Sequence, residues 1–208
     1  MHNHPNYCRP LGVKQSRSID TRNRIVAAAQ DLFLAKGFDG TSVAEVCRAA
    51  GVSNGALFHQ FPTKEALGFA VYSHVRRDFW NRVMAAMMAP EDPLDGIEAA
   101  VRAAFAFQLE EPGAAAFMFD ASGSKWIEQF AQQSQDVHDI VSGRGQAWAA
   151  PHIAAGRLPP VPPDVFVALA SGAPQWIGRM SRIGMNAHPL EVIAEQMPYY
   201  VRRAFTPE

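Results

Sequence analysis

The sequence predicts an all-α protein of about nine helices, and three kinds of observation support this prediction. Apolar residues recur every three to four positions through most of the 208 residues, as they do on one face of a helix. No segment alternates apolar and polar residues for long, as a half-buried strand would. Asp-Pro, Glu-Pro and single glycine signals divide the chain into helix-sized segments. A hydrophobic content of 48% is enough for a folded core.

The N-terminal segment is expected to be a flexible arm over residues 1–20, because it is polar and contains Pro5 and Pro10. The first helix is predicted over residues 21–36, where apolar side chains form one stripe. Gly37 follows this stripe and marks the C-terminal end of the helix.

Two short helices joined by a tight turn are predicted next. Ser42 and Glu45 fit the S-x-x-E capping box that begins a helix. Gly51 follows the last apolar position of that helix, where the chain often needs a positive φ. Ser53 is a suitable N-cap for a second short helix that ends near Gln60. This arrangement is a helix-turn-helix, and its second helix is of the type that enters the major groove of DNA.

The rest of the chain is also predicted to be helical. A long helix is expected over residues 63–88, and Ala89-Pro90 ends it. An Asp-Pro pair and a Glu-Pro pair begin two further helices, over residues 93–109 and 112–122.

Two more long helical stretches contain helix-disturbing residues. One is expected over residues 124–155, with a bend near Gly143 or at Pro151. The other is expected over residues 163–183, with a kink at Pro174.

Charge distinguishes a basic head from an acidic body. Residues 1–65 hold eight basic and five acidic side chains, a net charge of +3, whereas the whole chain has a net charge of −1. A basic end suits a protein that contacts phosphate at one end, although an imbalance of this size is common on ordinary surfaces. The expected domains are the arm, a helix-turn-helix head over residues 21–66, and a helical body over residues 67–208.

A longer pattern runs through the two short helices and their flanks. It consists of Gly37-Phe38, Thr41-Ser42-Val43, Val46-Cys47, Ala50-Gly51-Val52-Ser53, Gly55, Leu57, Phe61-Pro62-Thr63-Lys64-Glu65 and Leu67. These residues resemble the DNA-binding module of the TetR family of bacterial transcription regulators. The resemblance covers about residues 21–72. It implies a ligand-responsive regulator that binds a palindromic DNA operator as a homodimer, usually as a repressor, and that is released by a small effector.

Candidate DNA contacts come from the exposed start of the second short helix and from neighbouring helix ends. Asn54 offers both a donor and an acceptor, which suits adenine, and Ala56 offers only a methyl contact. Helix N-termini favour phosphate, and basic side chains attract it. The predicted DNA-binding residues are Arg22, Arg24, Thr41, Ser42, Ser53, Asn54, Gly55, Ala56, Phe58, His59, Thr63 and Lys64.

Two of these positions depart from the family pattern. Phe58 stands where the family usually has tyrosine, and Ala56 stands where it often has threonine. Phe58 removes a hydroxyl that commonly bonds a phosphate, a loss of about 1 kcal/mol for a typical hydrogen bond. Plainer alternatives stay open: Arg22 and Arg24 could form a solvated helix face, and His59 could be a surface histidine that contacts nothing.

An apolar effector pocket is predicted in the body, which is rich in aromatic residues and methionine. The same residues would equally suit a plain hydrophobic core. The candidate ligand-binding residues are Phe105, Phe117, Met118, Trp126 and Trp148. Few charged residues interleave with them, so an apolar or aromatic effector is expected, with no cofactor. No metal site is expected either, because His2, His4 and Cys8 are loosely spaced.

A homodimer is predicted through two helices near the C-terminus. The first begins at Asp164 and ends at Ile183, and the last runs from Pro189 to Phe205. Two such helices from each of two subunits would close a four-helix bundle. The alternative is that both helices are buried within one subunit.

Rival functions have little support in the sequence. Motifs of hydrolases, nucleotide-binding loops and zinc proteases are absent, so an enzyme is not expected. A helical small-molecule carrier with a degenerate DNA-binding head remains the alternative. Without an 18-residue apolar run, a signal peptide or a disulfide framework, no membrane partner is expected, and the cytoplasm is the expected location.

Overall fold

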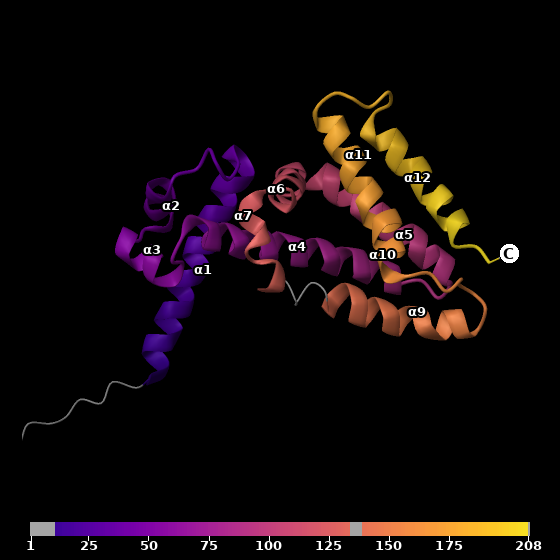
Figure 1. The fold of residues 1–208 in the computed structure, drawn as a ribbon, viewed down its shortest axis with the longest axis horizontal. Helices are drawn as coiled ribbons and strands as arrows, with labels where there is room; N and C mark the ends of the chain where they lie inside the picture. Colours follow the sequence, from indigo (N-terminus) through magenta and orange to yellow (C-terminus); the bar gives the residue numbers. More distant parts are fainter. Residues whose placement is uncertain (1–10, 134–138, 208) are drawn as a thin grey trace, which may run out of the picture. The chain divides into compact units, whose positions relative to one another are not determined.

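The computed structural model describes residues 11–133 and 139–207, and within these residues all regular structure is helical (Figure 1). The all-α prediction is therefore confirmed. The chain divides into two units, Met1–Val71 and Tyr72–Glu208. None of the helices in the described part combines the length and apolarity needed to cross a membrane.

The first unit contains three helices and the start of a fourth. They are α1 (Leu11–Lys36), α2 (Val43–Ala50), α3 (Asn54–Gln60) and α4 (Lys64–Met88), which continues into the second unit. Apolar side chains of α1, α2 and α3 meet in a common core, because each of these helices buries one face. Ile25, Phe33, Val46, Leu57 and Phe61 are almost completely buried there.

The helix α1 begins ten residues earlier than the sequence predicts. The predicted flexible arm over residues 1–20 is wrong for residues 11–20, which form the first turns of α1. Pro10 directly precedes the helix, a position where proline is tolerated, and the following residues contain no further proline. A hydrogen bond from Gln60 Nε2 to Ser18 Oγ, 3.0 Å long, ties this early part of α1 to α3. Residues 1–10 lie outside the described part of the chain.

The second unit contains the remaining helices. They are α5 (Pro93–Glu110), α6 (Pro112–Ser122), α7 (Lys125–Glu128), α9 (Gly145–Ala154), α10 (Pro163–Val167), α11 (Ala173–Arg182) and α12 (Leu190–Ala204), with short helical turns between some of them. The α12 helix runs alongside α5, and α11 packs against the same helix (Figure 1).

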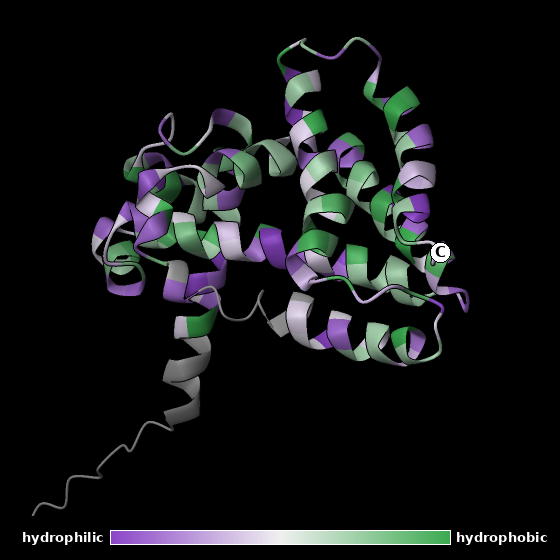
Figure 2. Ribbon diagram, turned by 45° about the vertical axis from the view of Figure 1, so that its right-hand side comes forward, coloured by the Kyte–Doolittle hydropathy of each residue, from purple (hydrophilic) through white to green (hydrophobic). Residues whose placement is uncertain are grey.

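A hydrophobic cluster at the centre of the second unit joins these helices. The cluster residues are Ile97, Val101, Phe105, Leu158, Ala170, Leu190, Val201 and Phe205. Hydrophobic and hydrophilic residues mix around the turns of α11 and α12, as amphipathic helices require (Figure 2). One side of each helix therefore contributes to the packing of the unit.

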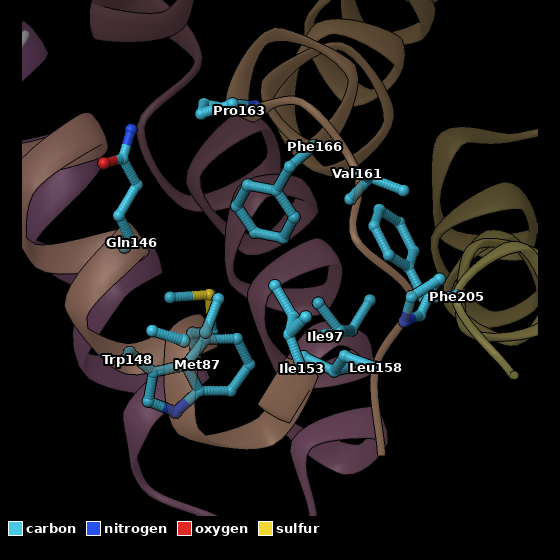
Figure 3. A pocket seen from close by; sticks show the side chains of 14 residues that line it. Met87, Ile97, Gln146, Trp148, Ile153, Leu158, Val161, Pro163, Phe166 and Phe205 are labelled. Atoms are coloured by element: carbon cyan, nitrogen blue, oxygen red, sulfur yellow. The ribbon is translucent and has the colours of Figure 1, made fainter. Parts of the chain in front are cut away.

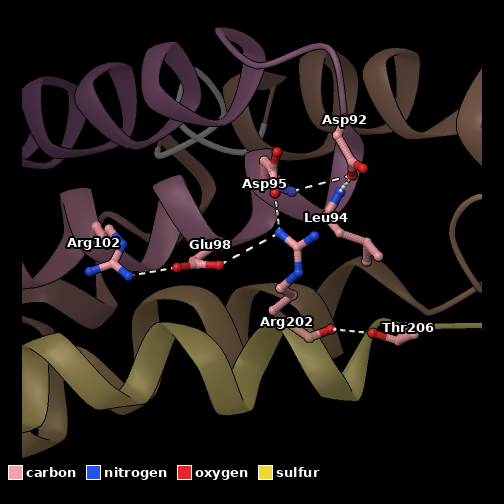
Figure 4. Close-up of polar contacts among 7 residues, drawn as sticks. All are labelled: Asp92, Leu94, Asp95, Glu98, Arg102, Arg202 and Thr206. Atoms are coloured by element: carbon pink, nitrogen blue, oxygen red, sulfur yellow. Dashed lines mark hydrogen bonds and ion pairs between the residues drawn. The ribbon is translucent and has the colours of Figure 1, made fainter.

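Polar contacts fix the start of α5 and its pairing with α12 (Figure 4). Asp92 is the predicted N-cap, and its Oδ1 accepts a hydrogen bond from the backbone N–H of Leu94 at 2.7 Å. The guanidinium of Arg202 on α12 pairs with Asp95 and lies 3.6 Å from Glu98 Oε2, both on α5. These contacts orient the C-terminal helix along α5.

The two long helical stretches are interrupted where the sequence contains helix-disturbing residues. The predicted helix over residues 124–155 is wrong as one continuous element, since α7, a 3₁₀ turn, a π-helical turn (Asp139–Arg144) and α9 take its place. Next to the predicted kink at Pro174, a π-helical turn (Ala168–Gly172) directly precedes α11, whose first turn contains this proline. Proline has no N–H to continue the regular hydrogen-bond ladder, which accounts for this distortion.

Candidate nucleic-acid interface

The capping box of α2 forms as its sequence predicts. The backbone N–H of Glu45 donates to Ser42 Oγ at 3.2 Å, and the backbone N–H of Ser42 donates to Glu45 Oε2 at 2.8 Å. Gly51 ends α2 with a φ of 65°, a conformation that favours glycine. These local contacts fix the length of α2 and the direction in which the chain turns toward α3.

The carboxylate of Glu45 gives the first unit a predictable response to acid. Lys36 Nζ lies 2.7 Å from Glu45 Oε1. This hydrogen bond and those from the backbone and hydroxyl of Ser42 lower the pKa of Glu45 from 4.5 to about 2. Because the folded pKa lies below the unfolded one, the stabilisation is present above about pH 4.5 and is lost as the pH falls toward 2.

We therefore expect Glu45→Gln to reduce the acid sensitivity of the first unit. The variant should have a lower melting temperature than the wild type at pH 6, and the difference should shrink as the pH falls toward 2. Thermal unfolding followed by circular dichroism across this range measures the effect. Glu91→Gln, which removes an exposed carboxylate from the second unit, controls for the loss of one charge. A difference between wild type and Glu45→Gln that does not change with pH would contradict this account.

The leading edge of α3 is exposed. Ser53 caps the helix, and its Oγ accepts a hydrogen bond from the backbone N–H of Ala56 at 3.2 Å. Leu57 is fully buried and anchors the helix to the core. The predicted contact residues Asn54, Gly55, Phe58 and His59 are all exposed, and Ala56 is half-buried. The helix therefore presents a row of side chains outward while its opposite face is fixed.

Thr63 and Lys64 are two of the predicted phosphate contacts, and both lie at the start of α4. Thr63 is exposed and its Oγ1 accepts from the backbone N–H of Ala66 at 3.1 Å, so it caps α4. Lys64 Nζ lies 4.3 Å from the centre of the Phe38 ring, which holds the ammonium group at the surface by a cation–π contact.

Thr41 differs from Thr63 and Lys64. Its side chain is 1% exposed, and its hydroxyl lies 3.0 Å from the Gly37 carbonyl oxygen and 3.3 Å from that of Leu32. A hydroxyl used in this way stabilises the end of α1 and does not face solvent. The Thr41 side chain is therefore committed to the end of α1, and the predicted phosphate contact at this helix start, which depends on the backbone and the helix dipole, stays a prediction.

Arg22 and Arg24 hold the helix-turn-helix together. Arg24 Nη2 donates to the carbonyl oxygens of Ala50 at 2.9 Å and Gly51 at 3.1 Å, at the C-terminal end of α2. Cations are favoured there because the last carbonyls of a helix lack partners. Arg22 Nη1 donates to the Gln60 carbonyl at 3.2 Å at the end of α3. This clamping role was not predicted, since no residue near either arginine in the chain signals it.

The second unit contains an apolar cavity of about 270 Å³ (Figure 3). Of the five predicted pocket residues, Trp148 lies in its wall. Phe105 lies in the central cluster, Phe117 and Met118 are buried on α6, and Trp126 lies half-buried on α7; none of these four residues lines the cavity. The lining residues are Met87, Ile97, Gly145, Gln146, Trp148, Ala149, Ala150, Ile153, Leu158, Pro159, Val161, Pro163, Phe166 and Phe205. The spacing of the lining residues of α9 along one helical face is a signal that could have indicated part of this wall.

Within the part of the chain that the structure describes, no group of three potential metal ligands comes together. The candidate ligands His2, His4 and Cys8 lie outside this part of the chain.

The head matches a known domain. A family model described as bacterial regulatory proteins, tetR family, matches residues 25–71. The matched segment includes α2, the Gly51 turn and α3, which are the elements that expose Asn54 and its neighbours.

Curated relatives are transcriptional regulators. The HTH-type transcriptional regulator RutR of Escherichia coli strain K12 is 28% identical over 164 residues, which cover 76% of this chain and 75% of RutR. The HTH-type transcriptional regulator CymR of Pseudomonas putida is 38% identical over 78 residues, which cover 36% of this chain and 38% of CymR.

Solved structures share the fold. The crystal structure of a TetR family transcription regulator from Marinobacter aquaeolei VT8 has a TM-score of 0.71 at 18% identity, covering 93% of this chain and 100% of that one. A TetR transcriptional regulator from Chloroflexus aurantiacus J-10-FL has a TM-score of 0.68 at 22% identity with the same coverage. The head over residues 25–71 therefore matches the DNA-binding domain of the tetR family of bacterial regulatory proteins, and the chain as a whole shares the fold of solved TetR family regulators.

Proposed function

We propose that this chain is a TetR family regulator, a homodimeric repressor that binds a palindromic operator and is released by a small apolar or aromatic effector. The observation that carries the proposal is the exposed leading edge of α3, where Asn54 and Gly55 follow the cap Ser53. A helix of this kind reads base edges with its first residues. The cytoplasm, where the DNA is, is the location that this function requires.

Within this proposal, different residues have different roles. Asn54 contacts a base edge through its amide, and Gly55 allows the backbone to approach the groove. Lys64 and the cap residues Ser42 and Thr63 lie at helix starts, where phosphate is favoured. Arg22 and Arg24 act through the positions of α2 and α3, whose C-terminal carbonyls they bind.

Exposed apolar side chains on the last two helices support the homodimer. Trp176 is 56% exposed and Tyr200 is 63% exposed, although both are large and apolar. Other large apolar side chains exposed on these helices or next to them are Ile183, Met185, Val192 and Tyr199. Apolar patches of this kind mark association surfaces. A two-fold dimer through this face would present two α3 helices to the two halves of a palindrome.

Release by an effector requires that the effector bind the two conformations of the dimer with different affinities. The effector would bind in the second unit and favour the conformation in which the two heads do not fit the operator. Such coupling is reciprocal, so operator DNA should weaken effector binding by the same factor.

A DNA-binding experiment distinguishes the proposed repressor from the alternative, a small-molecule carrier with a degenerate DNA-binding head. The DNA fragment is taken from upstream of the chain's own coding region. Fluorescence anisotropy should show saturable binding that weakens steeply between 50 and 200 mM salt, because phosphate contacts release counterions. A random fragment of equal length should bind more weakly at every salt concentration. Equal binding of both fragments would favour the carrier and overturn the proposed repressor.

Restoring the family's tyrosine is expected to strengthen operator binding. Phe58 is an exposed aromatic residue on α3, so Phe58→Tyr adds a hydroxyl at the surface without disturbing the core. One additional hydrogen bond to phosphate contributes about 0.5–1.5 kcal/mol per head, a several-fold gain in affinity. Phe130→Tyr, in the turn after α7 in the second unit, provides the control, with no change expected in anisotropy titrations. An unchanged affinity for Phe58→Tyr would show that this position does not face the DNA backbone.

A further inference from the structure

The apolar cavity of the second unit, which we call the α9 cavity, is lined on one side by the helix α9. None of the residues of α9 is fully buried. Trp148 and Ile153 are partly buried and pack against the central cluster. Gln146, Ala149 and Ala150 complete the face that α9 turns toward the cavity. A ligand in this space would bury apolar surface that the unit itself leaves incompletely covered.

The chemistry of the wall excludes a charged ligand. None of its fourteen residues carries a charge, and the side chains with polar atoms are those of Gln146 and Trp148. An ion placed there would lose its hydration without gaining a counter-charge, which is strongly unfavourable. Figure 3 shows the amide of Gln146 apart from the group formed by Ile153, Leu158 and their neighbours. The wall therefore suits a neutral molecule with one hydrogen-bonding group.

The shape of the wall favours a flat molecule. Gly96 on α5 lies against the Trp148 ring, since a Cβ added there would be 3.0 Å from Trp148 Cζ2 and would also meet the Met87 carbonyl. The indole can thus lie close to α5 only while residue 96 is glycine. Phe166 and Phe205 add two further rings to the wall, and aromatic rings pair well with flat π systems. A volume of about 270 Å³ limits the ligand to one or two rings.

We propose that the α9 cavity is the effector site and that its ligand is an uncharged, flat molecule of one or two rings with a single hydrogen-bonding group. This assignment rests on the ligand-responsive function proposed above. The ligand also contacts Met87 in the last turn of α4, the helix that follows the helix-turn-helix in the chain. The site therefore touches the element through which the two units are connected.

A pair of fluorescent probes tests the chemical class. 2-Naphthol is neutral and flat, with two fused rings and one O–H group, whereas naphthalene-2-sulfonate carries a negative charge on the same ring system. When the probes are titrated into the full chain, the neutral probe should bind saturably. The dissociation constant of the sulfonate should be higher by about tenfold or more. Absence of saturable binding by the neutral probe, or equal affinity for both probes, would overturn the assignment.

Two alanines of α9 provide matched variants for the location. Ala149 lines the cavity, and Ala147 is exposed on the same helix and is not among the lining residues. Ala149→Phe should raise the dissociation constant of the neutral probe about tenfold or more, because the new ring occupies the cavity. Ala147→Phe should leave it unchanged. Equal probe affinity in the two variants would place the probe elsewhere and overturn the site.

A second readout keeps the test decisive if Ala149→Phe does not fold. Energy transfer from tryptophan to the bound neutral probe should fall strongly in Trp148→Phe and little in Trp126→Phe, since only Trp148 lies in the cavity wall. The opposite ranking would overturn the site. Operator binding without probe is measured on the same proteins. A chain that binds the operator but fails the probe tests retains the proposed repressor function and loses only this site.

Discussion

Asn54→Ala is expected to cause the largest loss of operator affinity among single substitutions in α3. A side chain that makes two hydrogen bonds to a base contributes about 1–3 kcal/mol. A homodimer uses two copies, so the loss is about 2–6 kcal/mol, or roughly thirty-fold to twenty-thousand-fold in the dissociation constant. Asn54 is exposed at the start of α3, so its truncation leaves the core of the first unit intact. Anisotropy titrations with wild-type operator measure the loss.

Discrimination between operator sequences distinguishes the loss of a base contact from a general loss of DNA affinity. Asn54→Ala should bind operator variants that differ at one base pair of each half-site with nearly equal affinity, whereas the wild type should discriminate among them. Asn81→Ala removes an exposed asparagine from the part of α4 in the second unit and should change neither affinity nor discrimination. Retained discrimination by Asn54→Ala would show that another residue reads the base.

Trp176→Ala is expected to dissociate the dimer. Tryptophan is the residue most often responsible for binding energy at interfaces, where its truncation costs about 2 kcal/mol or more. Two copies contribute to a two-fold interface, so the dimer dissociation constant should rise about a thousand-fold. Light scattering coupled to size-exclusion chromatography at micromolar concentration should show a dimer for the wild type and a monomer for the variant. Operator affinity should fall with it, because a monomer presents a single α3.

Two isoleucines with nearly equal exposure provide a matched control for this surface. Ile183 at the end of α11 is 53% exposed, and Ile19 on α1 is 55% exposed. Ile183→Asp places a carboxylate on the proposed interface and should weaken the dimer, since an unpaired charge would be desolvated there. Ile19→Asp should leave the protein a dimer, with the molar mass that light scattering gives for the wild type. A monomeric wild type, or dimers that tolerate both Trp176→Ala and Ile183→Asp, would contradict the proposed interface.

The candidate DNA-binding surface was largely predictable, because its signals lie close together in the chain. Ser42 and Glu45 are three residues apart, and Ser53 immediately precedes α3. The effector cavity was hardly predictable. Aromatic residues that line a cavity and those that fill a core have the same spacing along a helix, which is why Phe105 was predicted to line the pocket although it does not.

The sequence by itself determined most of the helices, the caps of α2, α3 and α5, and the exposed edge of α3, since these depend on hydrogen bonds and side-chain periodicity within a few residues. The tertiary structure decided which polar residues serve the fold. Arg24 binds the carbonyl of Ala50, 26 positions away, and Thr41 is buried against the end of α1. The tertiary structure also formed the α9 cavity from segments between Met87 and Phe205. Contacts over such separations depend on how whole helices pack, and no local pattern in the chain records that packing.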